Sequence, residues 1–175
     1  DPNKIERQPI PKMGRKAVEC NMLYIDGLEV PKDHLIGEEG EGFKYLLQGL
    51  NPERVLFAVE SIGLGFAALE RAATYAKERV VFGRPIGQNQ GIQHPLAKAW
   101  AELSAAEMLA YKAAGLYDAG QDCGAEANAA KYLGTEAGFR ACETAVLTHG
   151  GMGYAKEYHV ERMMREAMLA RIAPV

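Results

Sequence analysis

The chain has 175 residues, of which 48% are hydrophobic and 25% are charged, a composition typical of one globular domain rather than of a disordered chain. Its 20 basic and 23 acidic residues give a net charge of -3, so a nucleic acid is not an expected partner. The longest mostly apolar stretch, 55–69, is interrupted by Glu60 and Ser61 and is shorter than the about 20 residues that span a membrane, so no membrane span is expected.

Proline and glycine interrupt the first third of the sequence, and short apolar segments lie between them. Residues 22–25, Met-Leu-Tyr-Ile, have the composition of a β-strand. From Phe43 onward the apolar residues recur at helical spacing instead. We therefore expect a short strand-bearing arm over residues 1–36 and a helical domain over residues 37–175.

After an initial helical segment from Phe43, four long helices are predicted. The first of the four begins after Asn51, an expected N-cap, with Pro52 in its first turn and Glu53 at the positive end of its dipole. Its apolar stripe extends to Val80 in steps of three and four residues. The other three are predicted over 93–117, 125–148 and 157–172. Because short glycine-containing joints connect them, the predicted fold is mainly α, an antiparallel four-helix bundle.

Several common types of catalytic site are not expected from this sequence. The three cysteines form no Cys-x-x-Cys pair and the four histidines are scattered, so no metal site is predicted, and the cysteines are expected to be free thiols in a reducing compartment. The Glu-x-x-His pairs of di-iron bundles and the Gly-x-Ser-x-Gly turn of many hydrolases are also absent from the sequence. The first residues lack the pattern of a signal peptide, which favours a cytoplasmic protein.

Two segments could instead bind a cofactor that carries phosphate groups. Residues 78–86 read Glu-Arg-Val-Val-Phe-Gly-Arg-Pro-Ile and are followed by Gln90, while residues 150–154 read Gly-Gly-Met-Gly-Tyr. The forked guanidinium of Arg79 suits a diphosphate, and glycines let backbone amides approach phosphate oxygens. A helix C-terminus with a glycine stop and a tight turn between helices are the alternative interpretations.

These two segments, together with residues 37–43 (Gly-Glu-Glu-Gly-Glu-Gly-Phe) and 164–167 (Met-Arg-Glu-Ala), resemble the acyl-CoA dehydrogenases. The resemblance covers residues 18–172 and includes several motifs in the same order and spacing. It implies the end of that family's middle β domain and most of its C-terminal helical domain. It also implies an FAD-dependent flavoprotein of fatty acid metabolism that forms a homotetramer, a dimer of dimers. This domain by itself would then bind FAD poorly and be inactive.

In that family the corresponding segments reach the FAD of a neighbouring subunit. Carried over position by position, the resemblance implies FAD contacts at Arg79, Phe82, Asn89, Gln90, Gly150 and Gly151. One position departs from the family, because Leu147 stands where many members have a glutamine, three residues before the Gly-Gly pair. A hydrogen bond to the flavin is therefore expected to be lost or replaced.

The resemblance also bears on the catalytic base, a glutamate that removes the α-proton of an acyl-CoA thioester. Most members have this glutamate about nine residues after the position of Arg165, where this chain has Pro174, and proline is not a base. A minority, resembling isovaleryl-CoA and long-chain enzymes, have it at the start of the long helix, where this chain has Glu53. Glu53 is therefore the candidate base, and Asn51 and Arg54 are candidate substrate contacts. The alternatives are a helix-capping role for Glu53 and an ion pair for Arg54.

The function implied by the resemblance is oxidation of a saturated acyl-CoA to its trans-2-enoyl form, with transfer of the electrons to an electron-transfer flavoprotein or a similar acceptor. The compartment would be the cytoplasm, or the mitochondrial matrix in a eukaryote. Related flavin enzymes, an acyl-CoA oxidase or an enoyl-CoA reductase, share the fold. A non-catalytic scaffold, which Pro174 favours, and a helical oligomerisation module without flavin are further alternatives.

Overall fold

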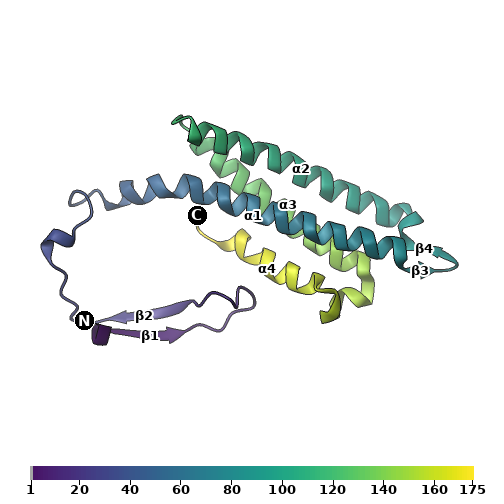
Figure 1. Cartoon of the computed structure of the whole chain (residues 1–175), viewed down its shortest axis with the longest axis horizontal. Coiled ribbons are helices and arrows are strands. Elements are labelled where there is room, and N and C mark those ends of the chain that lie inside the picture. The colour runs from purple at the N-terminus through teal and green to yellow at the C-terminus, as the bar shows by residue number, and fades with distance from the viewer. Residues whose placement is uncertain (1) are drawn as a thin grey trace. The chain divides into compact units, whose positions relative to one another are not determined.

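The computed structural model describes residues 2–175 (Figure 1). The chain divides into two compact units, the first ending at Gly49 and the second running from Leu50 to Val175. Within the described residues no helix is both long and apolar enough to cross a membrane.

The first unit contains a β-hairpin. Strand β1 (Ile5–Pro9) pairs antiparallel with β2 (Asn21–Ile25), which confirms the strand predicted over residues 22–25. Two short 3₁₀ turns, Pro2–Lys4 and Lys32–His34, precede and follow the hairpin in the sequence. The strand-bearing character predicted for the arm is thus confirmed.

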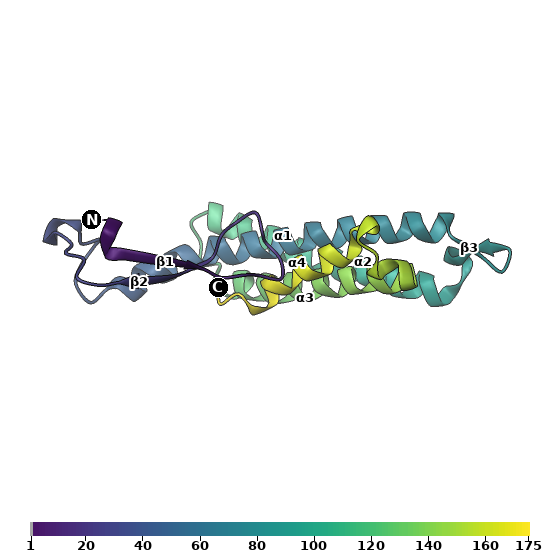
Figure 2. The ribbon, with the colours of Figure 1, turned by 90° about the horizontal axis from the view of Figure 1, so that it is seen from below.

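The second unit is a bundle in which each helix runs antiparallel to the one before it (Figure 1 and Figure 2). The first helix starts in the first unit and continues into the bundle. The elements are α1 (Gly42–Glu78), the short strands β3 (Val80–Val81) and β4 (Arg84–Pro85), α2 (Gln90–Asp118), α3 (Gly124–His149) and α4 (Val160–Ile172). Three 3₁₀ turns, Ile86–Gln88, Gly150–Tyr154 and Lys156–Tyr158, lie between them. The predicted antiparallel four-helix bundle is therefore confirmed.

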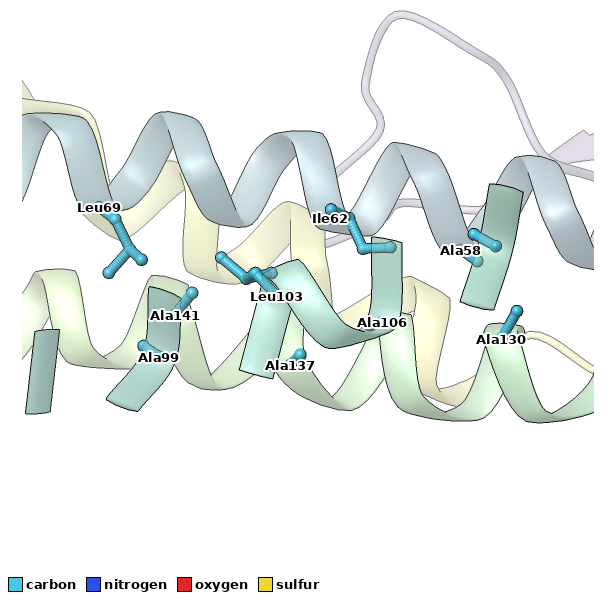
Figure 3. Close-up of a cluster of buried hydrophobic side chains, with 10 residues drawn as sticks. Ala58, Ile62, Leu69, Ala99, Leu103, Ala106, Ala130, Ala137 and Ala141 are labelled. Atoms are coloured by element: carbon cyan, nitrogen blue, oxygen red, sulfur yellow. The ribbon is translucent and has the colours of Figure 1, made fainter. Parts of the chain in front are cut away.

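Small side chains bring these helices close together. In the core cluster that joins α1, α2 and α3, only a few members, such as Ile62 and Leu103, are large (Figure 3). The alanines of this cluster are Ala58, Ala99, Ala106, Ala110, Ala130, Ala137 and Ala141. A second cluster joins α1 and α3 to α4 through residues that include Ala68, Cys142, Val160 and Met163. Because the alanine side chain is small, this core lets the helix axes approach each other closely.

The prediction that a helix begins at Asn51 is wrong. α1 runs without a break from Gly42 to Glu78 and contains Pro52 in its interior. Proline removes one N–H donor, so the helix loses one backbone hydrogen bond there, but the φ that its ring imposes is helical. Since the residues from Phe43 to Leu50 are already helical, the helix continues through the proline.

Two other predicted helix ends also differ from the structure. Val80 lies in β3 rather than in α1, because Phe82 and Gly83 have positive φ angles of 53° and 79° and reverse the chain. The last helix begins after His159 rather than at residue 157, because His159 has a φ of 62° and separates the helix from a 3₁₀ turn. At both helix ends, residues with a left-handed backbone conformation, rather than the spacing of apolar side chains, determine where the helix stops or starts.

Candidate functional site

Glu53, the candidate base, is half-buried on α1. The alternative that it caps the N-terminus of a helix is wrong, because α1 begins at Gly42 and Glu53 lies in its interior. Its side chain makes no hydrogen bond or ion pair within the part of the chain that the structure describes. The fold itself therefore leaves this carboxylate available for a bound molecule.

Asn51 and Arg54, the candidate substrate contacts, are joined to each other. Nη1 of Arg54 donates a hydrogen bond to Oδ1 of Asn51 over 2.9 Å. Nε of Arg54 is buried and has no acceptor among residues 2–175. A buried donor without a partner costs about 1–3 kcal/mol, and more on a charged group. An acceptor supplied by a bound molecule or by another part of the protein would thus be stabilising at this position.

The second candidate region begins where α1 ends, at the hairpin of β3 and β4. Val81 pairs with Arg84, and the two residues between them, Phe82 and Gly83, both have positive φ, as in a type I′ turn. Glycine adopts such a conformation readily, whereas an aromatic residue rarely does. The Phe82 ring is also fully exposed. The left-handed backbone at this aromatic residue makes Phe82 a candidate for a contact with another molecule.

The remaining residues of this region differ in how they are engaged within the chain. Oδ1 of Asn89 accepts from Nη2 of Arg84 over 2.7 Å, and Nδ2 of Asn89 donates to the carbonyl of Ile86 over 3.0 Å. Asn89 therefore connects the hairpin to the start of α2. Arg79 and Gln90 are exposed, and their side chains make no hydrogen bond to a described residue. The guanidinium of Arg79 is consequently available for a diphosphate.

The Gly-Gly turn follows α3 directly. Gly150 has a φ of 59°, which ends the helix, and a Cβ added at Gly150 or Gly151 would meet no atom within 4 Å. Packing inside the described chain therefore does not explain the glycine at 151, whereas Gly153 is pressed against the backbone of Val146. An open surface of bare backbone suits the close approach of a phosphate or of another chain. The open backbone of this turn and the exposed guanidinium of Arg79 would thus suit a phosphate-bearing cofactor.

The two candidate regions lie at opposite ends of the bundle. The hairpin and the Gly-Gly turn share one end, because α2 begins and α3 ends there (Figure 1). Glu53 lies in α1, and Arg79 directly follows the last residue of that helix. At the rise of about 1.5 Å per residue of an α-helix, the two residues are about 39 Å apart. The two regions of one chain are therefore too far apart to touch the same flavin ring.

Sequence reasoning missed His149, which it treated as one of four scattered histidines. Its ring is buried and stacks on Tyr75 of α1, with centroids 4.3 Å apart, and it meets the ring of Tyr158 edge to face, with centroids 5.3 Å apart. No local sequence signal reveals this cluster, because Tyr75 is far in the sequence from His149 and Tyr158. His149 is 4% exposed, whereas Leu147, two residues before it, is 72% exposed.

Arg165, the arginine of the 164–167 motif, is paired within α4. Its Nε donates to Oε2 of Glu161 over 2.8 Å, and this hydrogen bond lowers the pKa of the Glu161 carboxyl. Elsewhere in residues 2–175 there is no group of three or more His, Cys, Asp or Glu side chains placed to hold a metal ion. The three cysteines are free, as predicted.

Comparison with known proteins agrees with the resemblance seen in the motifs. Residues 40–174 match the family described as acyl-CoA dehydrogenase, C-terminal domain. The chain is 46% identical over 155 residues to an acyl-CoA dehydrogenase of Mycobacterium tuberculosis, covering 87% of this chain and 40% of the relative. It is 43% identical to an acyl-CoA dehydrogenase of Bacillus subtilis, covering 92% of this chain and 42% of the relative.

The fold is also similar to a solved structure, the butyryl-CoA dehydrogenase from Megasphaera elsdenii. The two share 34% identity with a TM-score of 0.92, over 97% of this chain and 44% of the other. The chain thus spans about two fifths of the length of the curated relatives that it matches. The matched residues include both candidate regions, from Glu53 to Gly151. The chain belongs to the acyl-CoA dehydrogenase family, of which it contains the C-terminal helical domain.

Proposed function

We propose that this chain is part of an FAD-dependent acyl-CoA dehydrogenase in which Glu53 is the catalytic base. The observation that carries the proposal is the match of residues 40–174 to the C-terminal domain of that family. The half-buried carboxylate of Glu53, without a partner in the described chain, supports the choice of base. Pro174, at the position where most members would have the base, has no side chain that accepts a proton.

In the proposed reaction, Glu53 accepts the proton from the α-carbon of the thioester, and the β-carbon loses a hydride as the double bond forms. FAD, when bound, supplies the acceptor of that hydride. A bound acyl chain would exclude water around Glu53. Nε of Arg54 would donate to an acceptor on the acyl-CoA, while Asn51 holds the guanidinium through its 2.9 Å hydrogen bond.

The proposed cofactor contacts are Arg79, Phe82, Asn89, Gln90, Gly150 and Gly151. Because Arg79 lies about 39 Å from Glu53 along α1 and the other contacts share its end of the bundle, one chain would contribute its base to one flavin and these contacts to the flavin of a neighbouring subunit. Such sharing requires an oligomer, and we propose a homotetramer built as a dimer of dimers. The exposed ring of Phe82 would then be covered in the assembly.

The remaining features of the proposal concern the whole protein. We propose that residues 1–36 are the end of a middle β domain and that residues 37–175 belong to the helical domain. The proposed electron acceptor is an electron-transfer flavoprotein, and the proposed compartment is the cytoplasm, or the mitochondrial matrix if the protein is eukaryotic.

The reaction can be tested on the full-length protein by anaerobic visible spectroscopy. We expect a short, branched or long acyl-CoA to bleach the absorption band of oxidised flavin, which would also identify the substrate class. A flavin band that no acyl-CoA bleaches would favour a scaffold, the second candidate, for which Pro174 is the supporting observation. Absence of a flavin band would contradict both the dehydrogenase and the flavin-containing scaffold, and it would favour a helical oligomerisation module.

The role of Glu53 can be tested by Glu53→Gln, which keeps the shape of the side chain but removes its basicity. We expect flavin to remain bound and the bleaching rate to fall by at least about a hundredfold, as for loss of a general base. Glu60→Gln, an exposed position on the same helix, is the matched control and should bleach at the normal rate. Normal bleaching by Glu53→Gln would show that another residue is the base.

A further inference from the structure

A cleft of about 440 Å³ lies beside the C-terminal half of α1. Residues of α1, the end of α3, the 3₁₀ turn Lys156–Tyr158 and α4 line it. This volume lies within the range of about 300–1,000 Å³ that is usual for small-molecule sites. None of the proposed contacts for FAD or acyl-CoA lines this cleft.

The charge of the cleft is negative. Among the described residues that line it, Glu70, Glu78 and Glu157 are acidic and Arg71 is the one arginine or lysine. None of these four side chains forms an ion pair with a residue that the structure describes. The carboxylates are therefore not neutralised by the fold, and the cleft attracts a positively charged group more strongly than an anion.

One wall of the cleft is aromatic. Tyr75 and His149 are stacked, and the ring of Tyr158 stands nearly perpendicular to Tyr75, with an interplanar angle of 85° and centroids 5.4 Å apart. The rings of Tyr75 and Tyr158 thus form a corner. The face of an aromatic ring attracts ammonium and guanidinium groups, particularly where carboxylates lie nearby.

His149 adds a hydrogen-bonding group to this wall. The residue is 4% exposed, and Nδ1 lies 2.7 Å from the carbonyl oxygen of Ala145. Because a carbonyl only accepts, Nδ1 carries the proton, and Nε2 of the neutral ring is then an acceptor. Nε2 has no partner within residues 2–175, although the residue lines the cleft. A ligand with N–H donors would satisfy it.

From this combination we propose that the cleft binds an organic cation, an alkylammonium or alkylguanidinium group. The aromatic corner would contact its apolar part and its charge, the three carboxylates would balance the charge, and Nε2 of His149 would accept one N–H. A free amine and the lysine or arginine side chain of a partner protein share this chemistry. The site goes beyond the proposed dehydrogenase activity and does not depend on it.

Isothermal titration calorimetry on the full-length protein at low salt tests the site. The probes are n-butylguanidinium and n-butyrate, which have similar apolar chains and opposite charge. We expect saturable binding of n-butylguanidinium that weakens as salt is added, and no binding of n-butyrate. Equal binding of the two probes, or no binding of n-butylguanidinium, would overturn the proposal.

Two variants locate the binding. Glu70→Gln with Glu157→Gln removes two charges from the cleft, and we expect about tenfold weaker binding of n-butylguanidinium. The matched control, Glu107→Gln with Glu143→Gln, makes the same change in net charge outside the cleft and should bind normally. An equal loss in both double variants would mean that the protein attracts the probe only through its overall charge, which would overturn the proposed site.

The contribution of His149 to binding is tested by His149→Phe, which keeps an aromatic ring but removes Nε2. We expect weaker binding of n-butylguanidinium by this variant, at an unchanged stoichiometry.

N-acetyl-arginine amide then distinguishes the two sources of the cation. Binding equal to that of n-butylguanidinium would favour the side chain of a partner protein, and binding of n-butylguanidinium alone would favour a free amine or guanidine.

Discussion

Cys142 is a residue whose chemistry is controlled by its position in the core. It lies fully buried where α3 meets α1 and α4, and this burial raises the pKa of its thiol to about 12. The reactive form of cysteine is the thiolate. We therefore expect iodoacetamide at about pH 8 to leave Cys142 unmodified in the native protein and to alkylate it after unfolding in urea. Peptide mass spectrometry of the two samples checks this, and equal alkylation would mean that this helix contact opens frequently.

Individual residues of the candidate site were unequally predictable. Glu53 and Arg79 stand in sequence motifs, so the sequence alone suggested them. The pairing of Arg54 with Asn51 and the availability of Arg79 required coordinates, because a motif does not reveal whether a side chain is already engaged. His149 could not be recognised at all, since its stacking partner Tyr75 lies on a different helix.

Among the individual elements, the hairpin of β3 and β4 carries backbone strain at one position. The left-handed conformation costs a residue other than glycine about 1–2 kcal/mol, and Phe82 adopts it without any packing of its exposed ring against the described chain. This strain is consistent with the contact to another molecule that we propose for Phe82. The strain can be measured by exchanging residues at the turn.

Phe82→Gly should raise the thermal midpoint of the protein by an amount equivalent to up to about 1 kcal/mol, because glycine adopts a φ of 53° without strain. The same variant should contain less flavin if Phe82 is a cofactor contact. Gly83→Ala is the matched substitution in the opposite direction and should lower the midpoint, since Gly83 has a φ of 79°. Thermal unfolding and the ratio of flavin to protein report the two effects separately. A lower midpoint for Phe82→Gly would refute the strain.

The helices show where periodicity is a sufficient signal and where it is not. The predictions for 93–117 and 125–148 agree with α2 and α3 to within a few residues, because apolar spacing and glycine joints act together there. The prediction failed at Pro52, where Asn-Pro-Glu has the pattern of a helix start although the helix is already formed. A local pattern identifies a possible start but does not exclude that the chain before it is helical.

The stability of the bundle as a whole depends on helix contacts that only small residues allow. A Cβ at Gly138 of α3 would collide with the backbone carbonyl of Ser61 on α1, whereas a Cβ at Gly63 of α1 would meet nothing within 4 Å. We expect Gly138→Ala to destabilise the protein by about 1–3 kcal/mol, as overpacking does. Gly63→Ala should stabilise it by about 0.5–1 kcal/mol, because alanine is the better helix former. Shifts of the unfolding midpoint with the same sign would contradict this account of the α1–α3 contact.

Because α1 is unbroken between the two candidate regions, the number of residues between Glu53 and Arg79 sets both their separation and the direction in which Arg79 points around the helix axis. Each residue of an α-helix advances the chain by about 1.5 Å and turns it by about 100°. One residue inserted between Glu53 and Arg79 would lengthen the segment only slightly but would rotate Arg79 by more than a quarter turn about the helix axis. Seven inserted residues, close to two full turns, would nearly restore its direction. Natural variation in length should therefore be confined to the joints between helices, while this segment keeps its phase.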